Sequence, residues 1–127
     1  DQRLIAEVKK NWLEALPSGN YKQGRSALGA VKNGEVTYCC LGVLCEIQGL
    51  GYEPFEGVFR YFYRDTYETS VTPPGFSEAI GLVTAYGAIY YSFTFEGEPF
   101  WGEASLADLN DYGFSFNQIA DMIEYFL

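Results

Sequence analysis

The stretch around Asn33-Gly34 constrains the fold more than any other part of the chain. Asn-Gly tolerates the positive φ angles of a tight turn, and it lies between two β-prone stretches, residues 26–31 and 35–39. From Cys40 to Ile47 the apolar residues recur at intervals of three and four, which is the period of a buried helix. A hairpin that leads directly into an apolar helix predicts an α+β domain.

Other segments with a clear period fit the same class. Ser115 and Gln118 have the spacing of a capping box, which marks the start of a C-terminal helix. The remaining segments are a helix at residues 2–16, a strand at 58–64, a short helix after Thr72-Pro73-Pro74, and a strand at 88–95. The pattern predicts one α+β domain over residues 1–127, with antiparallel hairpins packed with about four helices.

The charge of the chain restricts the ligands that it can bind. The net charge is −9, which argues against general affinity for nucleic acid or for an anionic membrane. Residues 1–32 nevertheless carry six basic and three acidic side chains, whereas the remaining 95 residues carry 14 acids and only Arg60 and Arg64. An anionic ligand is therefore expected at the N-terminal segment or at this arginine pair.

No stretch has the character of a secretion signal or of a bilayer span. The least polar long run, Val83–Phe95, has 13 residues and is interrupted by Gly87, so it is too short to cross a membrane. We expect a cytoplasmic protein.

Three cysteines, Cys39, Cys40 and Cys45, raise the question of a metal or redox site. On one helix, Cys40 and Cys45 lie about 140° apart around the axis, so they neither bridge nor share a metal readily. The chain has no histidine, so a four-ligand zinc site and an imidazole-activated thiol each lack a component. We interpret the three thiols as core residues.

The absence of histidine also bears on enzyme activity. It removes the Ser-His-Asp mechanism and the commonest acid–base group at neutral pH. Paired carboxylates remain available, but no pair stands out. We expect a protein without catalytic residues, metal or cofactor, and keep a carboxylate-based nucleotide hydrolase as an alternative.

The segment Asp108–Gly113 resembles the start of a calcium loop. The fifth position of the loop is Tyr112, and the twelfth, where a bidentate Glu is needed, is Ile119. We interpret the segment as a polar turn between two helices, in which Asn110 and Asp111 bond the local backbone.

The strand at residues 58–64 carries the strongest ligand-binding pattern. Arg60 and Arg64 lie on one face, about 13 Å apart in a regular strand, and guanidinium groups suit phosphates. Tyr61 and Tyr63 project from the other face, where rings can stack on a base. The alternative is an edge strand whose arginines pair with the surrounding acids.

Other parts of the chain add candidates to this ligand-binding set. A glycine-bounded loop offers Lys22 and Arg25 as anion contacts, although it lacks the Gly-Lys-Ser/Thr ending of a P-loop. Tyr91 and Trp101 are further rings that either line a pocket or fill the core.

Several motifs together resemble a group of small tailed-phage proteins. The motifs are Asn11–Leu16, Ser18–Gly24, Tyr38–Cys45, Leu106–Asp111, and Ser115-Phe116 followed by Ile119–Asp121. They cover the two ends and the cysteine segment. The resemblance implies a phage origin and supplies no catalytic residue. Small non-enzymatic phage proteins often counter host defence, some by sequestering cyclic ADP-ribose isomers or cyclic dinucleotides.

The resemblance and the aromatic residues (10 Phe, 11 Tyr and 2 Trp) lead to one functional expectation. The protein is expected to sequester a small nucleotide-derived immune signal in an infected bacterium without cleaving it, as a homo-oligomer. No contact with nucleic acid or membrane is expected. The first alternative is an acidic inhibitor that binds a host nucleic-acid-binding or defence protein. The carboxylate-based hydrolase is the second.

Overall fold

The computed structural model describes residues 4–127, apart from the side chains of Phe93 and Phe100. Residues 1–3, which include the expected start of the first helix, lie outside the described part. The helices are α1 (Ala6–Ala15), α2 (Cys40–Ile47), α3 (Phe76–Ile80), α4 (Leu106–Asp111) and α5 (Phe116–Phe126), with a 3-10 turn, η1, at Leu16–Ser18. The strands are β1 (Gly29–Lys32), β2 (Glu35–Tyr38), β3 (Tyr52–Phe55), β4 (Val58–Tyr63), β5 (Thr66–Glu68), β6 (Ala88–Phe95) and β7 (Glu98–Ser105). This is the predicted α+β class.

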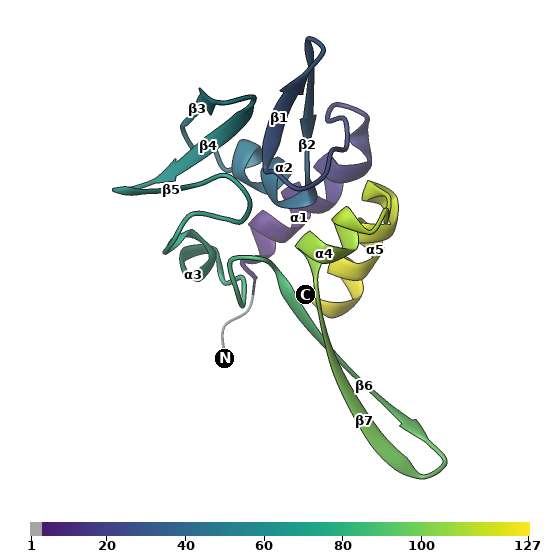
Figure 1. Ribbon diagram of the computed structural model, residues 1–127. Coiled ribbons are helices and arrows are strands. Elements are labelled where there is room, and N and C mark those ends of the chain that lie inside the picture. The colour runs from purple at the N-terminus through teal and green to yellow at the C-terminus, as the bar shows by residue number, and fades with distance from the viewer. Residues whose placement is uncertain (1–3) are drawn as a thin grey trace.

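Five strands form one antiparallel sheet (Figure 1). Its order is β2-β1-β4-β3, and β5 also pairs with β4. The predicted turn between β1 and β2 is confirmed, since Asn33 and Gly34 have φ angles of 53° and 76°. Strands β3 and β5 were not predicted from the sequence. Because β4 pairs with β1, β3 and β5, it has partners on both sides and is not an edge strand.

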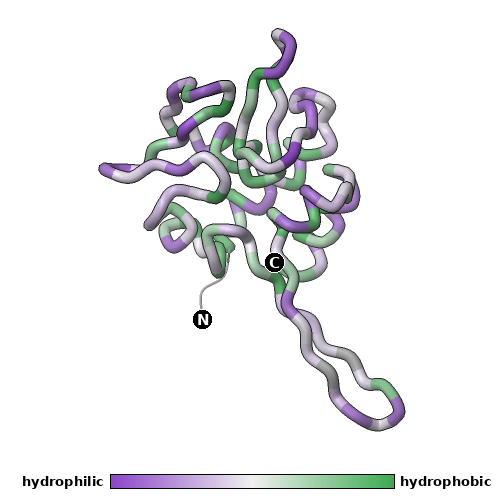
Figure 2. Tube along the Cα trace, in the orientation of Figure 1, coloured by the Kyte–Doolittle hydropathy of each residue, from purple (hydrophilic) through white to green (hydrophobic). Residues whose placement is uncertain are grey.

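Helix α2 forms the middle of the hydrophobic core. Every residue from Cys40 to Cys45 is buried, which confirms the core interpretation of the cysteines. The buried indole of Trp12 on α1 donates a hydrogen bond of 3.0 Å to the carbonyl oxygen of Cys40 and ties the two helices together. Figure 2 shows hydrophilic residues at the hairpin tips, away from this core. Within residues 4–127, no helix is both long and apolar enough to cross a bilayer.

The C-terminal helices pack against the same core. The predicted capping box is confirmed, because the Ser115 hydroxyl accepts from Gln118 N at 3.1 Å and Gln118 Oε1 accepts from Ser115 N at 2.9 Å. The turn predicted at Asp108–Gly113 is wrong in part. Ser105 caps α4 there, and Asn110 is fully buried and bonds residues far away in the sequence rather than the local backbone.

Strands β6 and β7 form a second, separate sheet of two strands. They reach away from the body of the protein as one long hairpin (Figure 1). The two strands are joined by a two-residue turn, Glu96-Gly97. Only the base of the hairpin is anchored, where Ala88 and Ile89 are buried.

Candidate functional site

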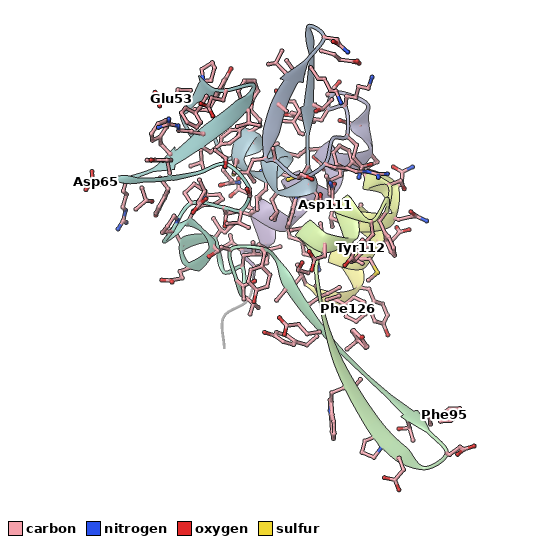
Figure 3. All side chains as sticks on the ribbon, viewed as in Figure 1. Glu53, Asp65, Phe95, Asp111, Tyr112 and Phe126 are labelled. Carbon is pink, nitrogen blue, oxygen red and sulfur yellow. The ribbon has the colours of Figure 1, made fainter. Side chains whose placement is uncertain are left out.

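The structure distributes the eight predicted ligand-binding residues over three regions. Four of them, Arg60, Tyr61, Tyr63 and Arg64, lie on β4 or in the turn that follows it. Tyr91 and Trp101 lie on the β6–β7 hairpin, whose tip is remote from the β4–β5 turn marked by Asp65 in Figure 3. Lys22 and Arg25 lie in the segment before β1. Within one chain, these residues therefore do not form a single site.

Arg60 is already engaged by neighbours in the sheet. Its guanidinium carbon lies 3.7 Å from the ring centre of Phe55 and 4.9 Å from that of Tyr67. Its Nη1 is 3.6 Å from the carboxylate of Glu53, and its side chain is only 21% exposed. Strands β3 and β5 supply these partners, and the sequence did not reveal them. These contacts use the guanidinium of Arg60 to hold the strands of the sheet together, so we remove Arg60 from the ligand-binding set.

Tyr61 cannot stack on a ligand, which corrects the prediction. Its side chain is fully buried, and its hydroxyl donates to Glu46 Oε2 at 2.9 Å. Burial, and then the hydrogen bond and charge of Glu46, raise the pKa of Tyr61 far above its ordinary value. The alternation of side chains along β4 was predicted correctly, but the face that carries Tyr61 is the one that packs on the core.

Tyr63 and Arg64 also differ from the prediction. Tyr63 is half-buried, and its ring packs against Phe76 of α3 at 5.6 Å between centroids. Arg64 is not part of the strand, because it has a φ of 55° and occupies the β4–β5 turn. The expected regular spacing of Arg60 and Arg64 on one strand face is therefore wrong.

The clearest concentration of cationic side chains is a groove beside the β1–β2 hairpin. The groove has a volume of about 390 Å³ and is lined by Lys22, Gly24, Arg25, Ala30, Lys32, Asn33, Glu35 and Thr37. We call it the β1–β2 groove. It brings Lys22 and Arg25 together, as expected, and adds Lys32, which sequence reasoning missed. The sequence did place Lys32 next to the predicted Asn33-Gly34 turn, and this position could have indicated that its side chain lies at the hairpin.

Backbone pairing holds the segment of Lys22 and Arg25 against β2. Gly24 N donates to Tyr38 O at 2.7 Å, and Tyr38 N donates to Lys22 O at 2.8 Å. A Cβ at Gly24 would lie 2.8 Å from Thr37 Cβ, so only glycine permits this approach. Lys22 forms an ion pair with Glu35, which leaves Arg25 and Lys32 as the cations of the groove without a salt bridge among the described residues.

A second hollow at the base of the β6–β7 hairpin has the opposite charge. Its volume is about 480 Å³, and Glu103, Asp108 and Asp111 line it without a basic residue among the described lining. Ser26 lines this acidic hollow, whereas its neighbour Arg25 lines the β1–β2 groove. The acidic hollow repels phosphates, so of these two hollows only the β1–β2 groove suits an anionic ligand. Among residues 4–127, no group of three or more Cys, Asp or Glu is arranged to hold a metal.

A family model described as a domain of unknown function, DUF8296, matches residues 4–78. This match covers more than half of the chain. The protein belongs to the DUF8296 family. No curated protein and no solved structure matches the chain. Every residue that lines the β1–β2 groove lies inside the part matched by the DUF8296 model, whereas the β6–β7 hairpin lies outside it.

The buried thiols of this DUF8296 protein are chemically quiet. Burial raises the pKa of Cys39 to about 11, and it raises the pKa values of Cys40 and Cys45 as well. At neutral pH all three thiols are therefore protonated and shielded from solvent, which removes the thiolate that a nucleophile or a metal ligand requires.

We expect the fold to lose stability above pH 8.5. In the unfolded chain a thiol titrates near pH 8.5, so raising the pH favours unfolding until the folded thiol also ionises, near pH 11 for Cys39. The contribution of Cys39 is fully present below pH 8.5 and amounts to about 3 kcal/mol. Urea midpoints measured between pH 7 and pH 10.5 check this. Cys39→Ala should make the decline shallower, because it removes one of the three thiols that cause it, and a decline of equal size in that variant would contradict the assignment.

Proposed function

We propose that this DUF8296 protein binds a small phosphate-bearing ligand in the β1–β2 groove and sequesters it without cleaving it. One observation carries the proposal: Lys22, Arg25 and Lys32 line a single hollow in a chain whose net charge is −9. A volume of about 390 Å³ suits a ligand of nucleotide size. The resemblance to tailed-phage proteins supports a nucleotide-derived immune signal as the ligand and the cytoplasm of an infected bacterium as the place of action.

The chemistry of the groove narrows the ligand class. Arg25 offers a planar fork that matches two phosphate oxygens, and Lys32 adds a mobile point charge. Glu35 holds Lys22 beside them. None of the described residues that line the groove is aromatic. We therefore infer that the ligand is selected by its phosphate or pyrophosphate group, and that base stacking contributes little. The homo-oligomer expected from the sequence remains part of the proposal.

Thermal unfolding with pyrophosphate, ADP-ribose and cyclic dinucleotides tests this function. A ligand at 100 times its Kd stabilises the fold by about 2.7 kcal/mol, which raises Tm by several degrees. The Arg25→Ala/Lys32→Ala variant should lose the shift, while Arg64→Ala removes an exposed arginine at the β4–β5 turn and should keep it. An unchanged shift in the double variant would contradict the groove. Chromatography of the mixture separates binding from turnover, since altered ligand would favour the carboxylate-based hydrolase.

The acidic hollow supports a second candidate function, an inhibitor that binds a basic host protein. Glu103, Asp108 and Asp111 form an acidic surface at the base of an exposed hairpin. Such a surface would attract a nucleic-acid-binding protein, and the interaction would weaken as salt rises. This candidate gains support if none of the phosphate ligands shifts Tm and a purified basic partner binds in a manner that Asp108→Asn weakens.

A further inference from the structure

The β6–β7 hairpin has two open edges. Each strand has eight residues and, among residues 4–127, pairs only with the other, so one side of each strand carries backbone groups without a ladder partner in the described chain. A two-stranded ribbon is only marginally stable alone, and an open edge is a template for another strand. The projecting hairpin also exposes aromatic rings, with Trp101 77%, Phe95 60% and Tyr90 57% accessible to solvent. Figure 3 shows Phe95 at the far end of the hairpin.

The hairpin register shows which backbone groups face outward. Phe95 pairs with Glu98 across a two-residue turn whose φ angles are 51° and 79°. In such a turn the closing pair exchanges both hydrogen bonds, and bonded and non-bonded pairs then alternate. On β6, the outward N–H and C=O groups therefore belong to Tyr90, Ser92 and Thr94. On β7, the outward positions are Pro99, Trp101 and Glu103.

The two edges differ in how they resist pairing. Strand β7 has Pro99 and Glu103 at outward positions, so it lacks one N–H donor and presents a charge. Proline and charge are the usual protections of an edge strand. Strand β6 has neither, because none of its eight residues, Ala88 to Phe95, is charged or proline. The unprotected edge of this hairpin is therefore β6.

The hairpin is also organised before any partner binds. The ring of Tyr91 lies over Gly102, its partner across the strands, in the space that a Cβ would occupy. A ring that covers a cross-strand glycine stabilises such a pair. Tyr91 thus holds the two strands together. This structural role accounts for the position of its ring without the predicted contact to a ligand.

We propose that β6 pairs with β6 of a second copy of this chain, antiparallel about a two-fold axis, to form a four-stranded sheet in the order β7-β6-β6-β7. A strand that mates with itself needs a self-complementary edge. A register centred on Ser92 sets Tyr90 opposite Thr94 of the other copy, a favourable aromatic and β-branched pair. This inference goes beyond the proposed ligand function and does not depend on the β1–β2 groove.

The uncharged edge of β6 is a surface at which two acidic copies of this chain can meet with little repulsion. Each copy carries a charge of −9, so most surfaces of two copies repel each other. Pairing through β6 adds no charged side chain to the new strand pair, whereas pairing through β7 would place Glu98 and Glu103 of each copy in it. The exposed rings of Tyr90, Tyr91 and Phe95, which lie on β6 itself, add apolar contact surface to the pair.

Sedimentation of the full chain over a range of concentrations tests the pairing. We expect a dimer that strengthens as salt rises, because salt screens the repulsion between two acidic copies. Ser92→Pro removes an outward donor of β6 and should weaken the dimer about tenfold or more. Trp101→Pro makes the same change at the facing position of β7 and should leave the dimer in place. A monomer at every concentration, equal loss in both variants, no loss in Ser92→Pro, or weakening by salt would overturn the proposal.

Amide hydrogen exchange of the unaltered chain tests the same edge without a substitution. The N–H groups of Tyr90, Ser92 and Thr94 should exchange slowly when the protein is concentrated and quickly after dilution. Those of Trp101 and Glu103 should exchange quickly under both conditions. Protection of the β7 amides in place of the β6 amides, or no dependence on concentration, would overturn the proposal even if the proline variants failed to fold.

Discussion

Replacing Gly42 with alanine is expected to destabilise the fold by at least about 3 kcal/mol, because the new methyl group would overlap the backbone of Leu28. A Cβ at Gly42 would collide with the Leu28 carbonyl oxygen and lie 2.6 Å from its carbonyl carbon. Leu28 cannot move aside. Its N donates to Thr69 O at 2.7 Å, and its O accepts from Cys39 N at 3.1 Å. Helix α2 and the residue that precedes β1 therefore meet at a distance that only glycine allows.

Urea denaturation measures this effect as a lower midpoint. Gly51→Ala is the matched control, since a Cβ there meets nothing within 4 Å and the backbone is not in the positive-φ region. That variant should be neutral or slightly more stable, because alanine restricts the unfolded chain. If the Gly42→Ala midpoint stayed close to that of Gly51→Ala, the close approach of α2 to Leu28 would be wrong.

The elements that the sequence predicted correctly are those with strong local signals. Asn33-Gly34 specifies its own turn, and Ser115 with Gln118 specifies the start of α5, so neither depends on distant contacts. Helix α2 was predictable because its apolar residues follow one period without interruption. In these places local propensity and the packing of the core agree.

The missing elements lack such signals. Strand β3 has only four residues, all exposed, and one of them is Pro54. Strand β5 has three residues, too few for an alternation to be recognised. Both exist because β4 offers them a partner, and such pairing between strands cannot be read from either strand alone.

The candidate site shows the same limit. The alternation along β4 correctly placed Arg60 and Tyr61 on opposite faces, but the pattern does not say what covers each face. Phe55 and Tyr67, from the two strands that were missed, stack on Arg60. Lys32 joined the β1–β2 groove only when the hairpin placed it beside Arg25. The basic residues could be counted from the sequence, but only the fold shows which of them line the same groove.

Asn110 is the residue whose structural role the local interpretation of the sequence missed most clearly. Its Oδ1 accepts from Gln23 Nε2 at 2.9 Å and from Cys40 N at 3.2 Å, and its Nδ2 donates to Gly24 O at 2.7 Å. The side chain is fully buried. One amide thus joins α4, the start of α2 and the segment that carries Lys22 and Arg25. A polar residue in a short helix gives no sign of such distant partners.

We expect Asn110→Ala to destabilise the fold by about 3 kcal/mol, since it leaves buried groups of Gly24 and Cys40 without a partner. Asn117→Ala, an exposed asparagine of α5, is the matched control and should change stability by less than about 0.5 kcal/mol. Urea midpoints of both variants check the prediction, and equal midpoints would contradict it.

A double-mutant cycle with Gln23→Ala separates the role of Asn110 in the network from its effect on packing. Gln23 also donates to Phe114 O at 2.6 Å and accepts from Phe116 N at 3.1 Å, so it connects the same segment to the start of α5. If the two amides act as one network, the double variant should lose less stability than the two single variants together, with a coupling of roughly 1 kcal/mol. Additive losses would mean that each amide acts alone. A coupled network would show that the C-terminal helices, which lie outside the part matched by the DUF8296 model, hold the cationic segment of the β1–β2 groove in place.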